Sequence, residues 1–201
     1  MRPALLVAVV VVFSACPRAV RPDVRVPITL SPTVWARDTQ IHYYDVAGDT
    51  EAELRAELDA KGPENDGVRH DAYTSWFVTW RYPFVHSDQG CATGPVTTDV
   101  KVVVTLPRWL GYADETQPLM KRWRRYLDAL KTHESGHRET GFRAASDISD
   151  TLQELPPKAT CDEVDEAATV AARAVLEKYR KADADYDNET RHGEAQGAVF
   201  P

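Results

Sequence analysis

Apolar and polar residues alternate along two stretches of the chain. In "YTSWFVTWRY" the alternate apolar positions are Trp76, Val78, Trp80 and Tyr82. In "TTDVKVVVTLP" they are Val100, Val102 and Val104. Because a strand with one buried face shows this period of two, both stretches are predicted to be neighbouring strands of a sheet. The aromatic and β-branched segment 40–46 predicts a further strand, whereas the connection "PFVHSDQGCATGPV" is predicted to be a loop from its Pro, Gly, Ser and Asp content.

A helical period follows in the second half of the chain. Between residues 117 and 155 apolar residues recur at intervals of three and four: Leu119, Trp123, Leu127, Leu130, Ile148, Leu152 and Leu155. This spacing predicts one long helix that ends at Pro156 and Pro157, because proline cannot continue a helix. A second helix is predicted over about residues 162–182, followed by the polar loop "YDNETRHGEAQGAVFP". A shorter, earlier helix is indicated by Thr50 and Glu53 at capping-box spacing and by the stop at Gly62-Pro63.

These elements predict an α+β fold in which a small β-sheet packs on a long helix, with a second helix towards the C-terminus. A chain of 201 residues with 43% hydrophobic content is long enough for one compact domain, which we assign to residues 31–201. The formal net charge is -7, so the long-range field of the protein would repel a phosphate backbone. Nucleic acid is therefore not an expected partner.

The first residues have the features of an export signal. "MRPALLVAVVVVFSAC" has a positive start at Arg2, an apolar run too short to cross a bilayer, and small residues before Cys16. "FSAC" is similar to a bacterial lipobox, whose cysteine becomes the lipid-bearing first residue, although Phe13 departs from the usual Leu. We therefore expect a signal peptide at 1–15, a lipid-anchor tether at 16–30, and attachment to a membrane through Cys16, which makes the protein an outer-membrane or periplasmic lipoprotein. The alternative is an ordinary secretory signal and a secreted protein.

Two cysteines remain beyond the signal, Cys91 and Cys161. Because an exported chain meets an oxidising compartment, we predict a disulfide between them. Such a bond closes a loop of about 70 residues and would stabilise the fold by ~4 kcal/mol. The alternative is two free buried thiols.

The candidate chemistry lies in "HESGH", residues 133–137 of the predicted long helix. Residues four apart share a helix face, so His133 and His137 can bind one metal ion while Glu134 lies beside it. Zn²⁺ suits imidazole ligands, and a water on zinc has a pKa lowered towards ~7, so Glu134 is the predicted general base. The alternative is a helix whose histidines are satisfied by carboxylates or carbonyls. Gly136 and Gly141 count against it, because glycine inside a helix costs roughly 1 kcal/mol and usually has a packing reason.

A catalytic zinc needs a third protein ligand. "HESGHRETGFR" has no third histidine at metzincin spacing, and the downstream acidic pair of gluzincins is absent. We choose His192, which lies in a glycine-flanked polar segment, as the third ligand, with Asp187 as the alternative. Tyr186 is a candidate hydrogen-bond donor to the oxyanion that forms when water adds to a carbonyl.

The chain resembles a family of bacterial exported proteins described as predicted secreted zinc-dependent proteases. The similar segments occur in order over nearly all of the mature chain: "YYDVAG", "YTSWFVTWRY", "TLPRW", "HESGH" and "YDNETRHGEAQGAVFP", with Cys91 and Cys161. The resemblance implies a zincin-like fold in which "HESGH" forms the zinc site. It also implies that the closing His-Gly element supplies the remaining ligand, which is His192 here.

We therefore predict an exported zinc-dependent metallohydrolase, an HExxH-type metallopeptidase with Glu134 as general base and a polypeptide as substrate. A zinc amidase acting on cell-wall peptides would share the same site and differ only in its cleft. The alternative from another class is a non-catalytic envelope lipoprotein, a binding or assembly module whose metal is structural or absent. A closed site with four protein ligands would favour that alternative.

Overall fold

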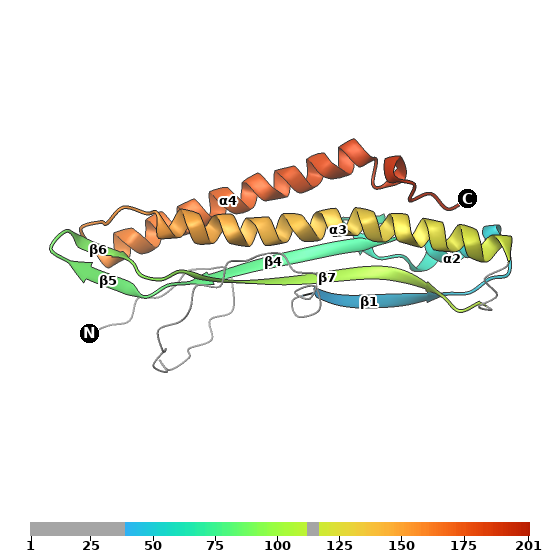
Figure 1. Cartoon of the computed structure of the whole chain (residues 1–201), viewed down its shortest axis with the longest axis horizontal. Helices are drawn as coiled ribbons and strands as arrows, with labels where there is room; N and C mark the ends of the chain where they lie inside the picture. Colours follow the sequence, from blue (N-terminus) through green and yellow to red (C-terminus); the bar gives the residue numbers. More distant parts are fainter. Residues whose placement is uncertain (1–38, 112–116) are drawn as a thin grey trace.

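The computed structural model describes residues 39–111 and 117–201 (Figure 1). The predicted signal peptide and tether, with Cys16, lie outside these residues. Within them the chain has an α+β fold, in which a mixed three-stranded sheet is covered on one side by long helices (Figure 1). None of the helices in the described ranges is both long and apolar enough to cross a membrane.

The central strand of the sheet is β7 (Thr97–Trp109). β1 (Thr39–Val46) pairs with it in parallel, and β4 (Tyr73–Arg81) pairs with it antiparallel. The alternation predicted for β4 and β7 is confirmed, because the inward Val78 and Val102 are buried. The strand order β1-β7-β4 makes β4 an edge strand of this sheet.

The connection predicted to be a loop contains a hairpin instead. β5 (Phe84–Ser87) pairs antiparallel with β6 (Gly90–Thr93), and a second small hairpin joins β2 (Glu64–Asn65) to β3 (Val68–Arg69). The prediction was wrong because the Ser, Asp and Gly signals belong to the tight turn between β5 and β6. Gly90 supplies the positive φ of 110° at this turn.

Three helices follow the predicted pattern in the described residues. α2 (Glu51–Lys61) begins with the predicted capping box of Thr50 and Glu53. α3 (Pro118–Gln153) is the predicted long helix, and it packs on β4 and β7. α4 (Cys161–Thr190) packs along α3 (Figure 1).

α4 is longer than the sequence predicted. The sequence pattern predicts a polar loop at "YDNET", but the helix continues through this segment to Thr190. Most residues of this segment are weak helix formers, but the segment contains no Gly or Pro. Its contacts with α3 override the weak helix preference. The helix ends where Arg191 and His192 both adopt a φ of 52° and Gly193 a φ of 86°.

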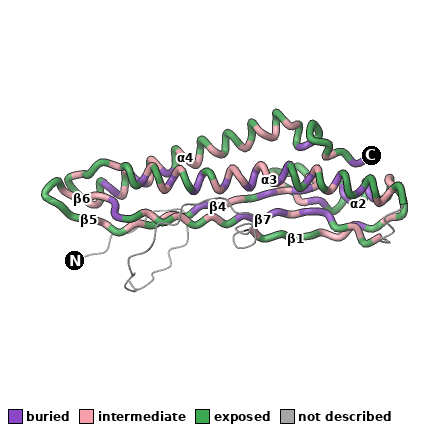
Figure 2. Tube along the Cα trace, viewed as in Figure 1, coloured by how far each residue is buried: buried purple, intermediate pink, exposed green. Residues whose placement is uncertain are grey.

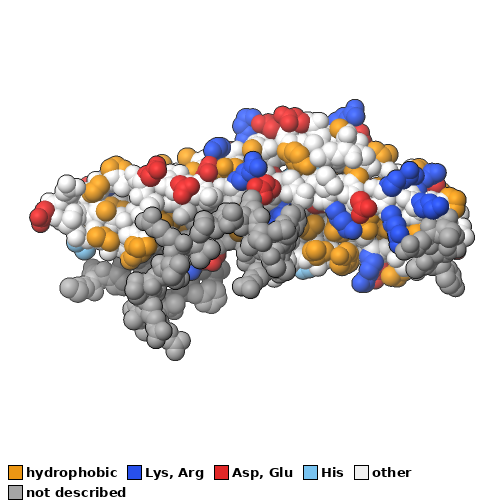
Figure 3. Space-filling model, viewed as in Figure 1, with side chains coloured by type: hydrophobic (Ala, Val, Ile, Leu, Met, Phe, Trp, Pro, Cys, Tyr) orange, Lys and Arg blue, Asp and Glu red, His pale blue; other side chains and the backbone are white. Residues whose placement is uncertain are grey.

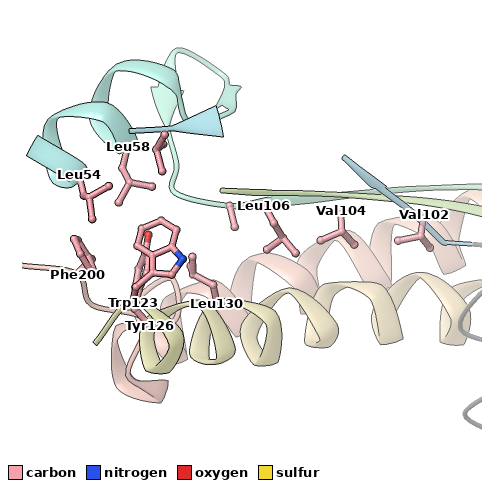
Figure 4. Packing of buried hydrophobic residues seen from close by; sticks show 11 residues of the cluster. Leu54, Leu58, Val102, Val104, Leu106, Trp123, Tyr126, Leu130 and Phe200 are labelled. Carbon is pink, nitrogen blue, oxygen red and sulfur yellow. The ribbon is translucent and has the colours of Figure 1, made fainter. Parts of the chain in front are cut away.

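Buried residues follow the side of α3 that faces the sheet (Figure 2). At one end of the molecule the core is aromatic, and Trp123 and Tyr126 of α3 lie against Phe200 and Leu54 (Figure 4). The ring centroid of Phe200 is 5.0 Å from that of Tyr126 and 5.4 Å from that of Trp123. Phe200 therefore anchors the C-terminal tail to the core.

The predicted disulfide between Cys91 and Cys161 is confirmed. Cys91 lies in β6 and Cys161 is the first residue of α4. Backbone hydrogen bonds in both directions between Cys91 and Lys158 support the same junction. The hairpin is thus fixed to the connection between α3 and α4.

Candidate metal centre

The two histidines of "HESGH" lie one turn apart on α3, on its buried side. His133 is 4% exposed and His137 is 8% exposed. Their Nε2 atoms are 3.2 Å apart. The predicted pairing of these two imidazoles on one helix face is therefore present in the structure.

Asp187 of α4 completes a group of three potential ligands. Its Oδ1 atom lies 3.2 Å from Nε2 of His133 and 3.1 Å from Nε2 of His137. In a tetrahedral site with bonds of about 2.0–2.1 Å, zinc would hold its ligand atoms ~3.3 Å apart. The triangle of two nitrogens and one carboxylate oxygen has this size, so these residues fit a zinc ion.

The other ring nitrogens of both histidines are held by hydrogen-bond partners. His137 Nδ1 lies 3.0 Å from Oδ1 of Asp183, whose Oδ2 accepts a hydrogen bond of 2.8 Å from Trp76 Nε1. His133 Nδ1 lies 3.1 Å from Oε1 of Gln196. Metal-binding histidines usually have such partners, which fix the ring and leave Nε2 free for the metal. Asp183 and Gln196 were not identified from the sequence, since neither lies near "HESGH" along the chain.

His192, the first choice for third ligand, lies next to this group. Its Nδ1 atom is 3.4 Å from Oδ1 of Asp187, and its side chain is 63% exposed. The structure therefore groups Asp187 with the two α3 histidines and places His192 beside the same oxygen. A role of His192 as a metal ligand stays a prediction.

Tyr186 packs against the metal-site helix. Its ring stacks on His133 with a centroid distance of 5.1 Å and an interplanar angle of 11°. Its hydroxyl donates to the carbonyl oxygen of His133 at 3.2 Å and accepts from Nε2 of Gln196 at 3.0 Å. These contacts position His133, and the predicted role of Tyr186 towards an oxyanion is not tested by them.

The two glycines of α3 have the predicted packing reason. A Cβ atom at Gly136 would lie 2.4 Å from the ring of Tyr186, and one at Gly141 would lie 2.7 Å from Cβ of Trp76. Gly136 therefore lets α4 approach α3 closely, and Gly141 does the same for β4.

Glu134 is also buried, at 4% exposure. The hydroxyl of Thr74, from β4, donates a hydrogen bond of 2.6 Å to its Oε2 atom. Burial raises the pKa of the Glu134 carboxyl, and this outweighs the opposite effects of Thr74 and the two histidines. Thr74 was not identified from the sequence, because it lies 60 residues from Glu134.

Charges of opposite sign stabilise each other in this group of side chains. Burial lowers the pKa of His137, but the hydrogen bonds and charges of Asp183 and Asp187 outweigh it and raise that pKa to about 10. Burial raises the pKa of Asp187, but its hydrogen bonds to His133 and His137 dominate and hold it below its usual range. The carboxylates therefore create a site that favours a cation.

These residues lie in a cleft with a volume of about 1010 Å³. The metal-site part of α3 lines the cleft, together with β4 from Tyr73 to Val78 and α4 from Leu176 to Asp187. His70 and His192 also line it, and their ring centroids are 6.0 Å apart. The cleft thus places an edge strand next to the candidate metal group.

Comparison with known protein families matches residues 41–193 to a family described as bacterial protein of unknown function (DUF922). This range includes "HESGH", Asp187 and His192. Searches of curated proteins and of solved structures found no match.

Proposed function

This chain belongs to the DUF922 family of bacterial proteins of unknown function, so we infer its activity from the geometry of the site. We propose that it is a zinc-dependent metallohydrolase with a zincin-like arrangement, and that its reaction is peptide hydrolysis. The observation that carries this proposal is the convergence of Nε2 of His133, Nε2 of His137 and Oδ1 of Asp187 within 3.2 Å of one another. A buried carboxylate, Glu134, follows directly on the same helix and lines the same cleft.

His133, His137 and Asp187 would hold the metal, which leaves a fourth position for water. Bound zinc supplies a water of lowered pKa and polarises the carbonyl of the substrate. Glu134 would take the proton of the attacking water, and Thr74 orients the Glu134 carboxylate by holding Oε2. We prefer Asp187 to His192 as third ligand because its Oδ1 atom lies 3.2 and 3.1 Å from the Nε2 atoms of the two imidazoles.

The cleft supports a peptide substrate. β4 is an edge strand of its sheet and lines the cleft from Tyr73 to Val78. An extended peptide can add to such an edge through main-chain hydrogen bonds. The same geometry would serve a cell-wall peptide, so an amidase remains within the proposed class.

The export signal and the lipid at Cys16 are part of the proposal and rest on the sequence alone. A non-catalytic envelope module is the competing function. It would be favoured if His192 joined Asp187 on the metal, because a site with four protein ligands is closed to water.

The test is metal analysis together with hydrolysis by the soluble domain. Mass spectrometry on protein purified without chelator should find about one zinc per chain in the parent and in Glu134→Gln, and little in His137→Ala or Asp187→Asn. His192→Ala should retain zinc. Hydrolysis of a mixed peptide library should occur in the parent and be absent in Glu134→Gln.

Three results would contradict the proposal. A parent without zinc after reconstitution would mean that the two histidines are ordinary helix residues. Zinc lost in His192→Ala but kept in Asp187→Asn would restore the first choice of ligand. Activity retained in Glu134→Gln would exclude the proposed base.

A further inference from the structure

One face of α4 carries charged side chains into the cleft. Arg180, Asp183 and Asp187 follow one another at intervals of three and four residues, so they share a helix face, and all three line the cleft. Asp183 and Asp187 belong to the candidate metal centre. Arg180 lies seven residues before Asp187, which at 1.5 Å per residue places it about 10 Å along the helix axis.

Two acidic residues of the same cleft are engaged with other partners. Asp183 binds His137 and Trp76, and the cleft residue Asp71 binds Arg55. Among residues 39–111 and 117–201, no carboxylate lies at ion-pair distance from the Arg180 guanidinium, although it lines a cleft rich in acidic groups.

The neighbouring cations of α4 differ from Arg180 in this respect. Lys178 binds Asp147 at 2.8 Å, and Lys181 binds Asp185 at 2.6 Å. Acidic and basic side chains are interspersed over the molecular face shown in Figure 3. Arg180 is therefore a local cation available to a ligand.

A guanidinium group matches a carboxylate through two parallel N–H···O bonds. An extended peptide advances about 3.3 Å per residue, so a span of about 10 Å corresponds to about three residues. We propose that Arg180 forms an anion subsite, which selects substrates with a carboxylate about three residues from the bond held at the metal. This inference rests on the proposed hydrolase function and names a substrate class for it.

The carboxylate has two possible sources. It is either the side chain of Glu or Asp in a longer peptide, or the C-terminal carboxylate of a short one. Both present the same chemistry to Arg180, and the probes below separate them.

The probes are short peptides with a zinc-binding hydroxamate at one end. One series has the hydroxamate at the C-terminus and either Glu or Gln at the third residue from it. A second series has the hydroxamate at the N-terminus, again with Glu or Gln at the third residue, and ends in a free carboxylate or an amide. Calorimetry on the zinc-loaded domain measures each dissociation constant without requiring turnover.

In the parent domain, at least one carboxylate probe should bind about tenfold more tightly than its neutral pair, as expected for a charge-assisted hydrogen bond. Arg180→Gln should remove this preference while zinc content and binding of the neutral probes stay unchanged. Arg173→Gln, two turns earlier on the same helix and outside the cleft lining, should keep it.

Equal binding of charged and neutral probes by the parent would overturn the subsite, and so would a preference that survives in Arg180→Gln. The proposed hydrolase function fails in a different way. A zinc-loaded parent that binds no hydroxamate at all has a closed metal site, and this result would remove both proposals.

Discussion

At the scale of single residues, the contact between α3 and α4 depends on the missing side chain at Gly136. Alanine there gains about 1 kcal/mol of helix propensity. Its Cβ atom would however lie 2.4 Å from the ring of Tyr186, which is held by His133 and Gln196, and overpacking of this kind costs about 1–3 kcal/mol. We expect Gly136→Ala to lower the free energy of unfolding by up to about 2 kcal/mol and to weaken zinc binding.

Urea denaturation and chelator competition measure both effects. Ser135→Ala is the matched control, because it changes the adjacent residue, whose hydroxyl bonds only the local helix carbonyl of Thr132 at 2.7 Å. A stabilised Gly136→Ala domain with normal zinc affinity would show that the two helices can separate at no cost.

Asp183 is not one of the proposed metal ligands, but we expect its loss to weaken zinc binding. It orients His137 through Nδ1 and is itself held by Trp76. We expect Asp183→Ala to lower zinc affinity about 10- to 100-fold, as is usual when the partner of a ligating histidine is lost. Chelator competition measures the affinity. Asp185→Ala, on the exposed side of α4, should leave the affinity unchanged, and an equal loss in both variants would point to general damage of the helix.

At the scale of elements, the disulfide and the proposed metal centre lie at opposite ends of α4. Cys161 fixes its first residue to β6, whereas Asp187 lies in its last turn. The bond joins residues 70 apart, so its removal in Cys91→Ser/Cys161→Ser should lower the free energy of unfolding by about 4 kcal/mol. Zinc content at low urea should not change. Urea denaturation with metal analysis tests this, and loss of zinc in the folded variant would mean that the two ends are coupled.

The sequence predicted the elements whose signals are local. The α2 capping box, the alternation of β4 and β7 and the long period of α3 depend on neighbours within a few residues, and all are confirmed. The β5–β6 hairpin was not predicted, because its turn residues are the same residue types that indicate a longer loop, and the predicted end of α4 is too early.

The candidate site was predictable to the same extent. His133, Glu134 and His137 follow from spacing on one helix. Thr74 and Asp183 approach them only through packing of β4 and α4, so neither could be identified from sequence spacing. The continuation of α4 also explains why Asp187, thought to lie in a loop, reaches the two histidines so directly.

At the scale of the whole molecule, the proposed metal centre would join two long helices. Two of the proposed ligand residues come from α3 and one from α4, and the hydrogen-bond partners of the histidines come from α4 and the C-terminal tail. The tail is anchored in the aromatic core by Phe200. A metal at this point would therefore stabilise the arrangement of α3, α4 and the tail together, and we expect it to bind the folded chain in preference to the unfolded one.

Preferential binding of zinc to the folded chain should raise the melting temperature Tm. A ligand at 1,000 times its dissociation constant stabilises the folded state by about 4 kcal/mol, and 1 kcal/mol shifts the Tm of a domain of this size by about 2–4 °C. We therefore expect zinc to raise the Tm of the metal-free domain by roughly 10 °C, and EDTA to reverse the shift. Calorimetry should show no such shift for His137→Ala or Asp187→Asn. If zinc binds the parent stoichiometrically and the Tm does not move, the ion is held as well by the unfolded chain, and the site does not join the helices as the geometry requires.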